Sequence, residues 1–201
     1  MNYLFVVAHP DDEVLGAGAT IHKLAEAGHR VAVATMSNSA AARKNASETL
    51  ADDQRRALEL LGVHQTYFAD FPNIQMNTVP HLALVQFIES CIADWGAEAI
   101  FTHHPADTNN DHVVTSYAAQ AASRLFQRRE HLPRLRQFAY MEVPSSTEWS
   151  FDVSSNRFTP SMFVEVGRDG IELKLKALAE YRGVQSGCCY AEAFESVFCS
   201  I

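Results

Sequence analysis

Two short segments of the sequence concentrate side chains that can bind a metal ion. The first is His9-Pro10-Asp11-Asp12-Glu13, in which three carboxylates and one imidazole fall within five residues. Carboxylates this close repel one another, and a bound cation would relieve that repulsion. His9 and Asp12 could supply two of the three protein ligands that are typical of a catalytic zinc site. Helix capping is the alternative, because acidic residues are favoured at helix N-termini, but it leaves His9 unexplained.

The second segment runs from His103 to His112 and contains three histidines and two aspartates. His112 can supply the third metal ligand. Asp107 or Asp111 can accept a hydrogen bond from the other ring N–H of a histidine and so fix its orientation. Taken alone, this segment could also be a capped helix with solvated histidines. The pairing of the two segments is what favours a metal site.

Each segment directly follows an apolar run that is typical of a buried strand. In an open parallel sheet, ligands bind beyond the carboxyl ends of the strands, so both segments are expected on one rim. Strands that alternate with helices predict an α/β, Rossmann-like, doubly wound three-layer fold with a mostly parallel sheet, in a single domain over 1–201. The expected strands are 3–8, 30–36, 66–69, 99–102, 136–143 and 162–166, and the expected helices are 14–27, 47–61, 79–95, 111–129 and 170–181.

Gly16 and Gly18 could be mistaken for part of a dinucleotide-binding fingerprint. They fall inside a predicted helix rather than in the turn before it, and the sequence contains no GxGxxG. Close packing of the helix on the sheet is the better explanation. The acidic first segment would also repel a pyrophosphate, which counts against a nucleotide-binding module.

Composition narrows the class of partner. The chain has 201 residues, with 16 Lys and Arg against 24 Asp and Glu, for a net charge of −8. Such acidity disfavours nucleic acid and anionic membranes as partners. The sequence shows no signal peptide and no apolar stretch long enough to span a membrane, so we expect a cytoplasmic protein. We expect its cysteines to be reduced thiols, because they form no CxxC pair; they are Cys91, Cys188, Cys189 and Cys199.

The AHPDDE run after the first strand, with the later Asp111-His112 pair, resembles the LmbE-like (PIG-L) zinc-dependent N-acetylglucosaminyl deacetylases. The resemblance implies that His9, Asp12 and His112 bind one Zn²⁺, or another divalent metal, per chain. It further implies that Asp11 is the general base that activates water and that Asp111 orients a neighbouring group. The implied partner is a small N-acetylated sugar or glycoconjugate, and relatives include homo-oligomers.

The sequence departs from the family pattern in two places. Many members carry a histidine, three residues before the metal-binding histidine, that helps to stabilise the oxyanion; here that residue is Asn109. Asn109 can still donate a hydrogen bond, and His104 or His103 is an alternative donor. The segment before the Arg-Gly-x-Gln-like run at 182–185 is also shorter than in many members.

Two further residues are candidates for substrate binding. Arg43 follows the second strand, although a solvated loop position is the alternative. Trp149, in the polar loop at 144–160, could stack on a sugar ring or anchor the loop.

Together, the two segments and the family resemblance imply a zinc-dependent hydrolase that removes an N-acetyl group from an N-acetylglucosamine-type sugar or conjugate. A metal hydrolase acting on another amide or an ester, and a non-catalytic Rossmann-like binding protein, remain alternatives.

Overall fold

The structure, a computed structural model, describes residues 1–37, 50–144, 146–150 and 157–182. Within these ranges, five strands form one sheet in the order β3-β2-β1-β4-β5, and each neighbouring pair is parallel. The predicted Rossmann-like parallel sheet is therefore confirmed. The strands are β1 (Asn2–Val7), β2 (Arg30–Thr35), β3 (Gln65–Phe68), β4 (Ala99–His103) and β5 (Gln137–Met141).

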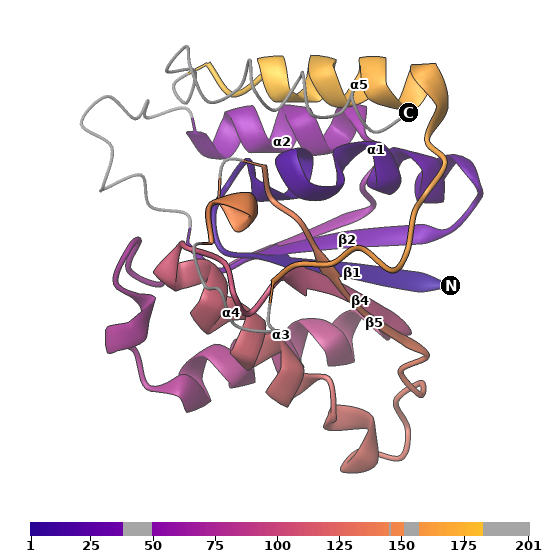
Figure 1. Cartoon of the computed structure of the whole chain (residues 1–201). Coiled ribbons are helices and arrows are strands. Elements are labelled where there is room, and N and C mark those ends of the chain that lie inside the picture. The colour runs from indigo at the N-terminus through magenta and orange to yellow at the C-terminus, as the bar shows by residue number, and fades with distance from the viewer. Residues whose placement is uncertain (38–49, 145, 151–156, 183–201) are drawn as a thin grey trace.

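Helices cover both faces of the sheet, as the doubly wound prediction requires. Figure 1 shows α1, α2 and α5 on one face and α3 and α4 on the other. The helices are α1 (Asp12–Glu26), α2 (Leu50–Leu60), α3 (His81–Trp95), α4 (Asn110–Ala122) and α5 (Gly167–Ala179).

The central strand β1 is apolar because it is buried on both sides. Phe5 packs into the core shared with α1 and α5, whereas its neighbour Leu4 packs into the core shared with α3 and α4. Both side chains are fully buried. Alternate side chains of a strand point to opposite faces, so a strand between two helical layers needs apolar residues at every position.

The two glycines of α1 serve close packing, in two different ways. A Cβ atom at Gly16 would lie 3.1 Å from the carbonyl oxygen of Glu142, just past the end of β5. This close approach of helix and sheet is the one the sequence predicts. A Cβ at Gly18 would lie 3.2 Å from Cγ of Lys174 on α5, so this glycine serves a contact between helices.

Two predicted elements differ from the structure. The expected strand at 162–166 is wrong: these residues form no strand, and Phe163 is 82% exposed. An apolar run becomes a strand only where a neighbouring strand offers a hydrogen-bonding partner, which local sequence does not reveal. The helix expected over 111–129 ends at Ala122 and is followed by a short 3₁₀ turn at Leu125–Gln127.

Two other findings concern the described part of the chain. None of its helices combines the length and the hydrophobicity needed to cross a membrane. Cys91 is buried and forms no disulfide, whereas the other three cysteines fall outside the described residues.

Candidate metal centre

Three side chains converge where β1 and β4 end. His9 follows β1, Asp12 opens α1, and His112 lies in the first turn of α4. One potential ligand atom from each lies within 4.8 Å of the other two, and all three residues are buried. β1 and β4 are adjacent parallel strands, so the segments that follow them meet at one edge of the sheet.

The Asp12 carboxylate lies between the two imidazoles. Its Oδ2 atom is 3.5 Å from Nδ1 of His9 and 3.2 Å from Nε2 of His112. The same oxygen accepts a hydrogen bond from the backbone N–H of His9 at 2.8 Å. This contact ties the turn to the start of α1 and fixes Asp12 between the histidines.

The second nitrogen of each imidazole faces another carboxylate. Nε2 of His9 is 3.0 Å from Oδ2 of Asp111, and Nδ1 of His112 is 3.2 Å from Oδ2 of Asp107. Metal-binding histidines typically direct their other ring nitrogen to a carboxylate, which fixes the tautomer and the ring orientation. In the part of the chain described, Nε2 of His112 is buried, and its 3.2 Å contact with Oδ2 of Asp12 lacks the geometry of a hydrogen bond. Two imidazole nitrogens and a carboxylate oxygen, with no well-formed hydrogen bond at Nε2, fit a divalent metal ion.

Both outer carboxylates are themselves held in place. Asp111 accepts hydrogen bonds from the backbone N–H groups of Ile74 at 2.5 Å and Met76 at 3.0 Å. These amides come from the loop that follows β3, so three separate segments of the chain meet at His9 and its partner Asp111. The orientation of His9 therefore depends on tertiary structure and not on its own loop alone.

Asp107 is held by the loop after β5. It accepts hydrogen bonds from the hydroxyl groups of Ser146 and Thr147, the latter at 2.7 Å, and from the backbone N–H of Asn109 at 2.8 Å. A buried carboxylate with this many donors stays ionised. The donors and the adjacent His112 lower the pKa of Asp107 to about 2, even though burial alone would raise it.

His103 is a neutral neighbour of the cluster formed by His9, Asp12 and His112. Its Nε2 accepts a hydrogen bond from the backbone N–H of Ala8 at 2.8 Å, so Nδ1 carries the proton. Its ring stacks on that of His112, with 3.9 Å between centroids. Burial and the nearby His112 lower the pKa of His103 well below its ordinary value.

The three converging residues shift one another's pKa values in a way that favours positive charge on the two imidazoles. Burial alone would lower the pKa of both His9 and His112, but the carboxylates outweigh it and raise these values to about 9 and about 10. The histidines in turn hold the pKa of Asp12 well below its usual range despite burial. Positive charge is thus favoured at the centre of the cluster.

Asp11 has an unusual backbone conformation. Its φ of 102° lies in the left-handed region, and its side chain is buried beside the cluster. The backbone N–H of Asp11 donates to Oε2 of Glu13 at 3.2 Å, and the Tyr181 hydroxyl donates to Oε1 of the same carboxyl. Burial raises the pKa of Glu13 to about 8.

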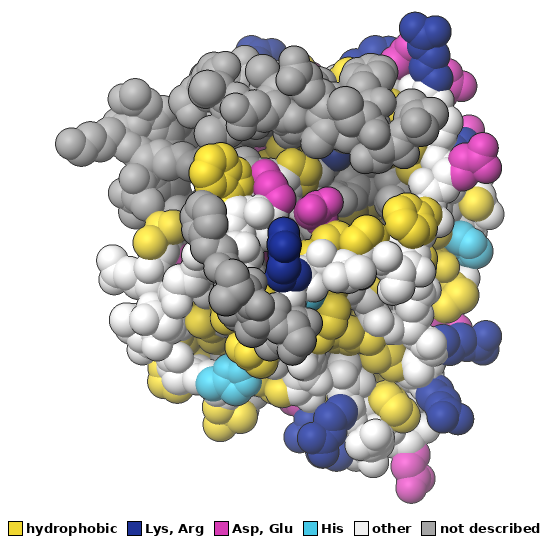
Figure 2. All heavy atoms as spheres, viewed as in Figure 1, with side chains coloured by type: hydrophobic (Ala, Val, Ile, Leu, Met, Phe, Trp, Pro, Cys, Tyr) yellow, Lys and Arg dark blue, Asp and Glu magenta, His cyan; other side chains and the backbone are white. Residues whose placement is uncertain are grey.

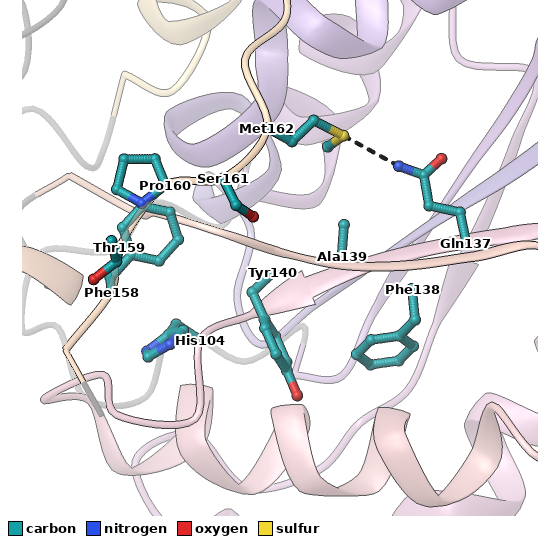
Figure 3. Close-up of a pocket in the computed structure, with 10 residues that line it drawn as sticks. All are labelled: His104, Gln137, Phe138, Ala139, Tyr140, Phe158, Thr159, Pro160, Ser161 and Met162. Atoms are coloured by element: carbon teal, nitrogen blue, oxygen red, sulfur yellow. Dashed lines mark hydrogen bonds between the residues drawn. The ribbon is translucent and has the colours of Figure 1, made fainter. Parts of the chain in front are cut away.

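Asn109 and His104, which are candidate oxyanion donors along with the buried His103, lie in different surroundings. The side-chain oxygen of Asn109 accepts a hydrogen bond from the backbone N–H of Asp111 at 2.9 Å and caps α4. The His104 ring lines a pocket of about 300 Å³ between β5 and residues 158–162, where it contacts the rings of Tyr140 and Phe158 (Figure 3).

The two expected substrate-binding residues are placed unequally. Trp149 is 52% exposed and ends the 3₁₀ turn Thr147–Trp149, next to the hydroxyl groups that hold Asp107. Arg43 lies outside the described residues, as do 183–185 of the Arg-Gly-x-Gln-like run. In the face shown in Figure 2, the described Lys and Arg side chains lie singly or in small groups.

Sequence reasoning missed several residues of this centre. Ser146 and Thr147 lie in the polar loop at 144–160, in which the sequence analysis singles out only Trp149. Tyr181, which reaches Glu13 across 168 positions of the chain, has no local signal at all. The backbone amides of Ile74 and Met76 were equally unpredictable, because any residue type carries them.

Comparison with known proteins establishes the family. Residues 4–123, more than half of the chain, match the PIG-L family model, described as GlcNAc-PI de-N-acetylase. The chain belongs to this family of deacetylases. An uncharacterized deacetylase, YaiS, of Escherichia coli (strain K12) is 29% identical over 187 residues, which cover 89% of each chain.

Solved structures share the fold. N,N'-diacetylchitobiose deacetylase from Pyrococcus horikoshii has a TM-score of 0.72 at 21% identity, covering 90% of this chain and 70% of its own. GalB, the 4-carboxy-2-hydroxymuconate hydratase from Pseudomonas putida KT2440, has a TM-score of 0.76 at 20% identity, covering 98% and 83%. Because these two proteins are described by different reactions, the fold alone does not define the reaction of this chain.

Proposed function

We propose that this protein is a Zn²⁺-dependent hydrolase that removes the N-acetyl group from an N-acetylglucosamine-type sugar or glycoconjugate. The observation that carries the proposal is the convergence of His9, Asp12 and His112 in a member of a deacetylase family. The residues around them support it, because each imidazole has a carboxylate on its other nitrogen and Asp11 lies buried alongside.

The metal would be held by Nδ1 of His9, a carboxylate oxygen of Asp12 and Nε2 of His112. These are the atoms left over once Asp111 and Asp107 engage the other imidazole nitrogens. When bound, Zn²⁺ supplies Lewis acidity that polarises the acetyl carbonyl and makes water a better nucleophile. Three protein ligands leave a coordination position for such chemistry.

Asp11 is the proposed general base and then general acid. Its carboxylate takes a proton from the attacking water as the new C–O bond forms. It returns that proton to the sugar nitrogen as the C–N bond breaks, which gives acetate and a free amine. Asp12 cannot take this role, because its carboxylate is committed to the two imidazoles.

The oxyanion needs a hydrogen-bond donor close to the reacting carbonyl. The oxygen of Asn109 is engaged in the helix cap, so its side-chain N–H groups are the part that can donate. The buried Nδ1–H of His103 is a second candidate. His104 is a third candidate donor, for a substrate that extends into the pocket lined by Tyr140 and Phe158.

The proposed substrate contacts are Trp149, as a surface on which a sugar ring can stack, and Arg43. The exposure of Trp149 beside the loop that holds Asp107 supports the first assignment. A cytoplasmic location and one metal ion per chain complete the proposal.

The experiment is to measure acetate and free-amine release from a panel of N-acetyl sugars, nucleotide sugars and N-acyl conjugates. Metal-stripped protein and the same protein reloaded with Zn²⁺ are compared. The proposal expects equal amounts of acetate and amine from at least one N-acetyl sugar, only after reloading. Release only from other amides or esters would favour the alternative metal hydrolase. Hydration of 4-carboxy-2-hydroxymuconate without any deacetylation would favour the reaction named for GalB.

A further inference from the structure

The backbone of the proposed base, Asp11, is in a conformation that residues other than glycine rarely adopt. Its φ is 102° and its ψ is −29°. Such a conformation persists only where surrounding contacts hold it, and it often marks a functional site. These two angles set the direction in which the Cα–Cβ bond of Asp11 leaves the backbone, and so the region that its carboxylate can reach. Whatever holds the backbone therefore also aims the carboxylate.

Two sets of contacts hold the peptide groups on either side of Asp11. On the C-terminal side, the carbonyl oxygen of Asp11 accepts hydrogen bonds from the N–H groups of Val14 at 3.0 Å and Leu15 at 2.9 Å, at the start of α1. On the N-terminal side, the N–H of Asp11 donates to Oε2 of Glu13. The helix secures the first side by itself. The second depends on the Glu13 carboxyl and on the Tyr181 hydroxyl, whose oxygen also faces the N–H of Asp11.

The Glu13 carboxyl is in turn held by Tyr181. The tyrosine hydroxyl donates to Oε1 of Glu13, and both side chains are completely buried. Buried polar groups need a hydrogen-bond partner, so the hydroxyl and the carboxyl constrain each other. Tyr181 lies just beyond α5, which packs against α1 in the layer shown in Figure 1 and contributes a second link from Lys174 Nζ to the carbonyl oxygen of Leu15 at 2.7 Å.

We propose that Tyr181 is a positioning residue for the deacetylation reaction: through Glu13 it keeps the Asp11 backbone left-handed and so aims the Asp11 carboxylate. This inference rests on the proposed function, in which Asp11 is the base. It assigns a role in the reaction to a residue just beyond α5, in a part of the chain outside the matched residues 4–123.

Three variants distinguish this role from simple packing. Tyr181→Phe keeps the buried ring and removes only the hydroxyl that Glu13 needs. Glu13→Gln keeps both links, because its amide oxygen can accept from the Asp11 N–H while its amide N–H donates to the tyrosine oxygen. Tyr3→Phe is the matched control: it removes the hydroxyl of another buried tyrosine, whose hydrogen bond goes to the sulfur of Met1 and not to the proposed site.

The first measurement needs no substrate. In Zn²⁺-loaded protein, the Asp11 amide is followed by ¹H–¹⁵N NMR and by hydrogen exchange. We expect slow exchange in the wild type, the Tyr3→Phe control and Glu13→Gln, and a shifted, faster-exchanging amide in Tyr181→Phe. Exchange in the wild type as fast as in an unstructured peptide would overturn the inference without any variant.

The second measurement separates kcat from KM on the best substrate of the panel. Misalignment of a catalytic group typically costs up to about 100-fold, so Tyr181→Phe should lower kcat by roughly 10- to 100-fold with KM and Zn²⁺ content unchanged. Glu13→Gln, which keeps both hydrogen bonds, should have a kcat within about threefold of the wild-type value. A Tyr181→Phe kcat equal to that of Tyr3→Phe, or a Glu13→Gln loss as large as that of Tyr181→Phe, would contradict the inference.

Asp11→Asn in the same assay keeps the two proposals apart. If Asp11→Asn loses turnover while Tyr181→Phe does not, only the role of Tyr181 is overturned. If Asp11→Asn keeps full turnover, the proposed base is overturned instead.

Discussion

Replacement of Asp107 by asparagine should weaken metal binding although Asp107 is not a proposed ligand. The Asp107 carboxylate contacts Nδ1 of His112 and accepts hydrogen bonds from Ser146, Thr147 and the Asn109 N–H. Asparagine has almost the same shape, but its NH₂ group would face hydrogen-bond donors, and it carries no charge to hold the imidazole. His112 should therefore lose its fixed orientation.

Loss of a carboxylate that orients a metal-binding histidine typically costs 10- to 100-fold in affinity. We expect the Zn²⁺ dissociation constant to rise in this range, which corresponds to about 1.4–2.7 kcal/mol. A chromophoric chelator that competes for Zn²⁺ at fixed pH measures the constant. Glu59→Gln is the matched control, since it removes one carboxylate charge from an exposed position on α2.

The thermal midpoint of the metal-free variants decides whether folding is a factor. If Asp107→Asn is folded and binds Zn²⁺ within twofold of the Glu59→Gln control, Asp107 does not orient His112. The assignment of Nε2 of His112 as the ligand atom would then lose its main support.

Four further outcomes are expected. Because His9 and His112 have pKa values raised to about 9 and about 10, Zn²⁺ binding near pH 7 should release about two protons, measurable by calorimetry in buffers of different ionisation enthalpy. The same raised pKa values stabilise the metal-free fold. This stabilisation is fully present below pH 6.5 and is lost as the pH rises through about 9 and 10, so the thermal midpoint of the metal-free protein should fall over that range. A constant midpoint would contradict the raised pKa values. Asp11→Asn should retain its Zn²⁺, as measured by atomic absorption, and lose at least about 100-fold in kcat; metal loss would instead make Asp11 a ligand. Trp149→Ala should raise KM by roughly 2- to 10-fold with kcat unchanged, whereas Trp149→Phe should have a KM close to that of the wild type. Equal KM values for the wild type, Trp149→Ala and Trp149→Phe would remove Trp149 from the substrate site.

The fold was predictable where burial leaves a local pattern. β1 and β4 read as continuous apolar runs because helices cover both of their faces. The run at 162–166 has a similar composition and forms no strand, because a strand depends on a partner elsewhere in the chain. Local sequence also could not show that α4 would end at Ala122.

The candidate site divides in the same way. The two dense segments predicted that His9, Asp12 and His112 would lie on one rim, because each segment follows a strand. The groups that hold them were hidden: Asp111 meets the backbone amides of Ile74 and Met76, and Glu13 meets Tyr181, through contacts that only the folded chain creates. Sequence spacing thus indicated which residues could bind the metal, but not what orients them.

The most direct test of the metal centre is anomalous diffraction at the zinc edge from crystals grown with one equivalent of Zn²⁺. We predict one strong peak per chain, within about 2.0–2.2 Å of Nδ1 of His9, an oxygen of Asp12 and Nε2 of His112. A peak at other residues, or none at these three in crystals that contain the metal, would contradict the account.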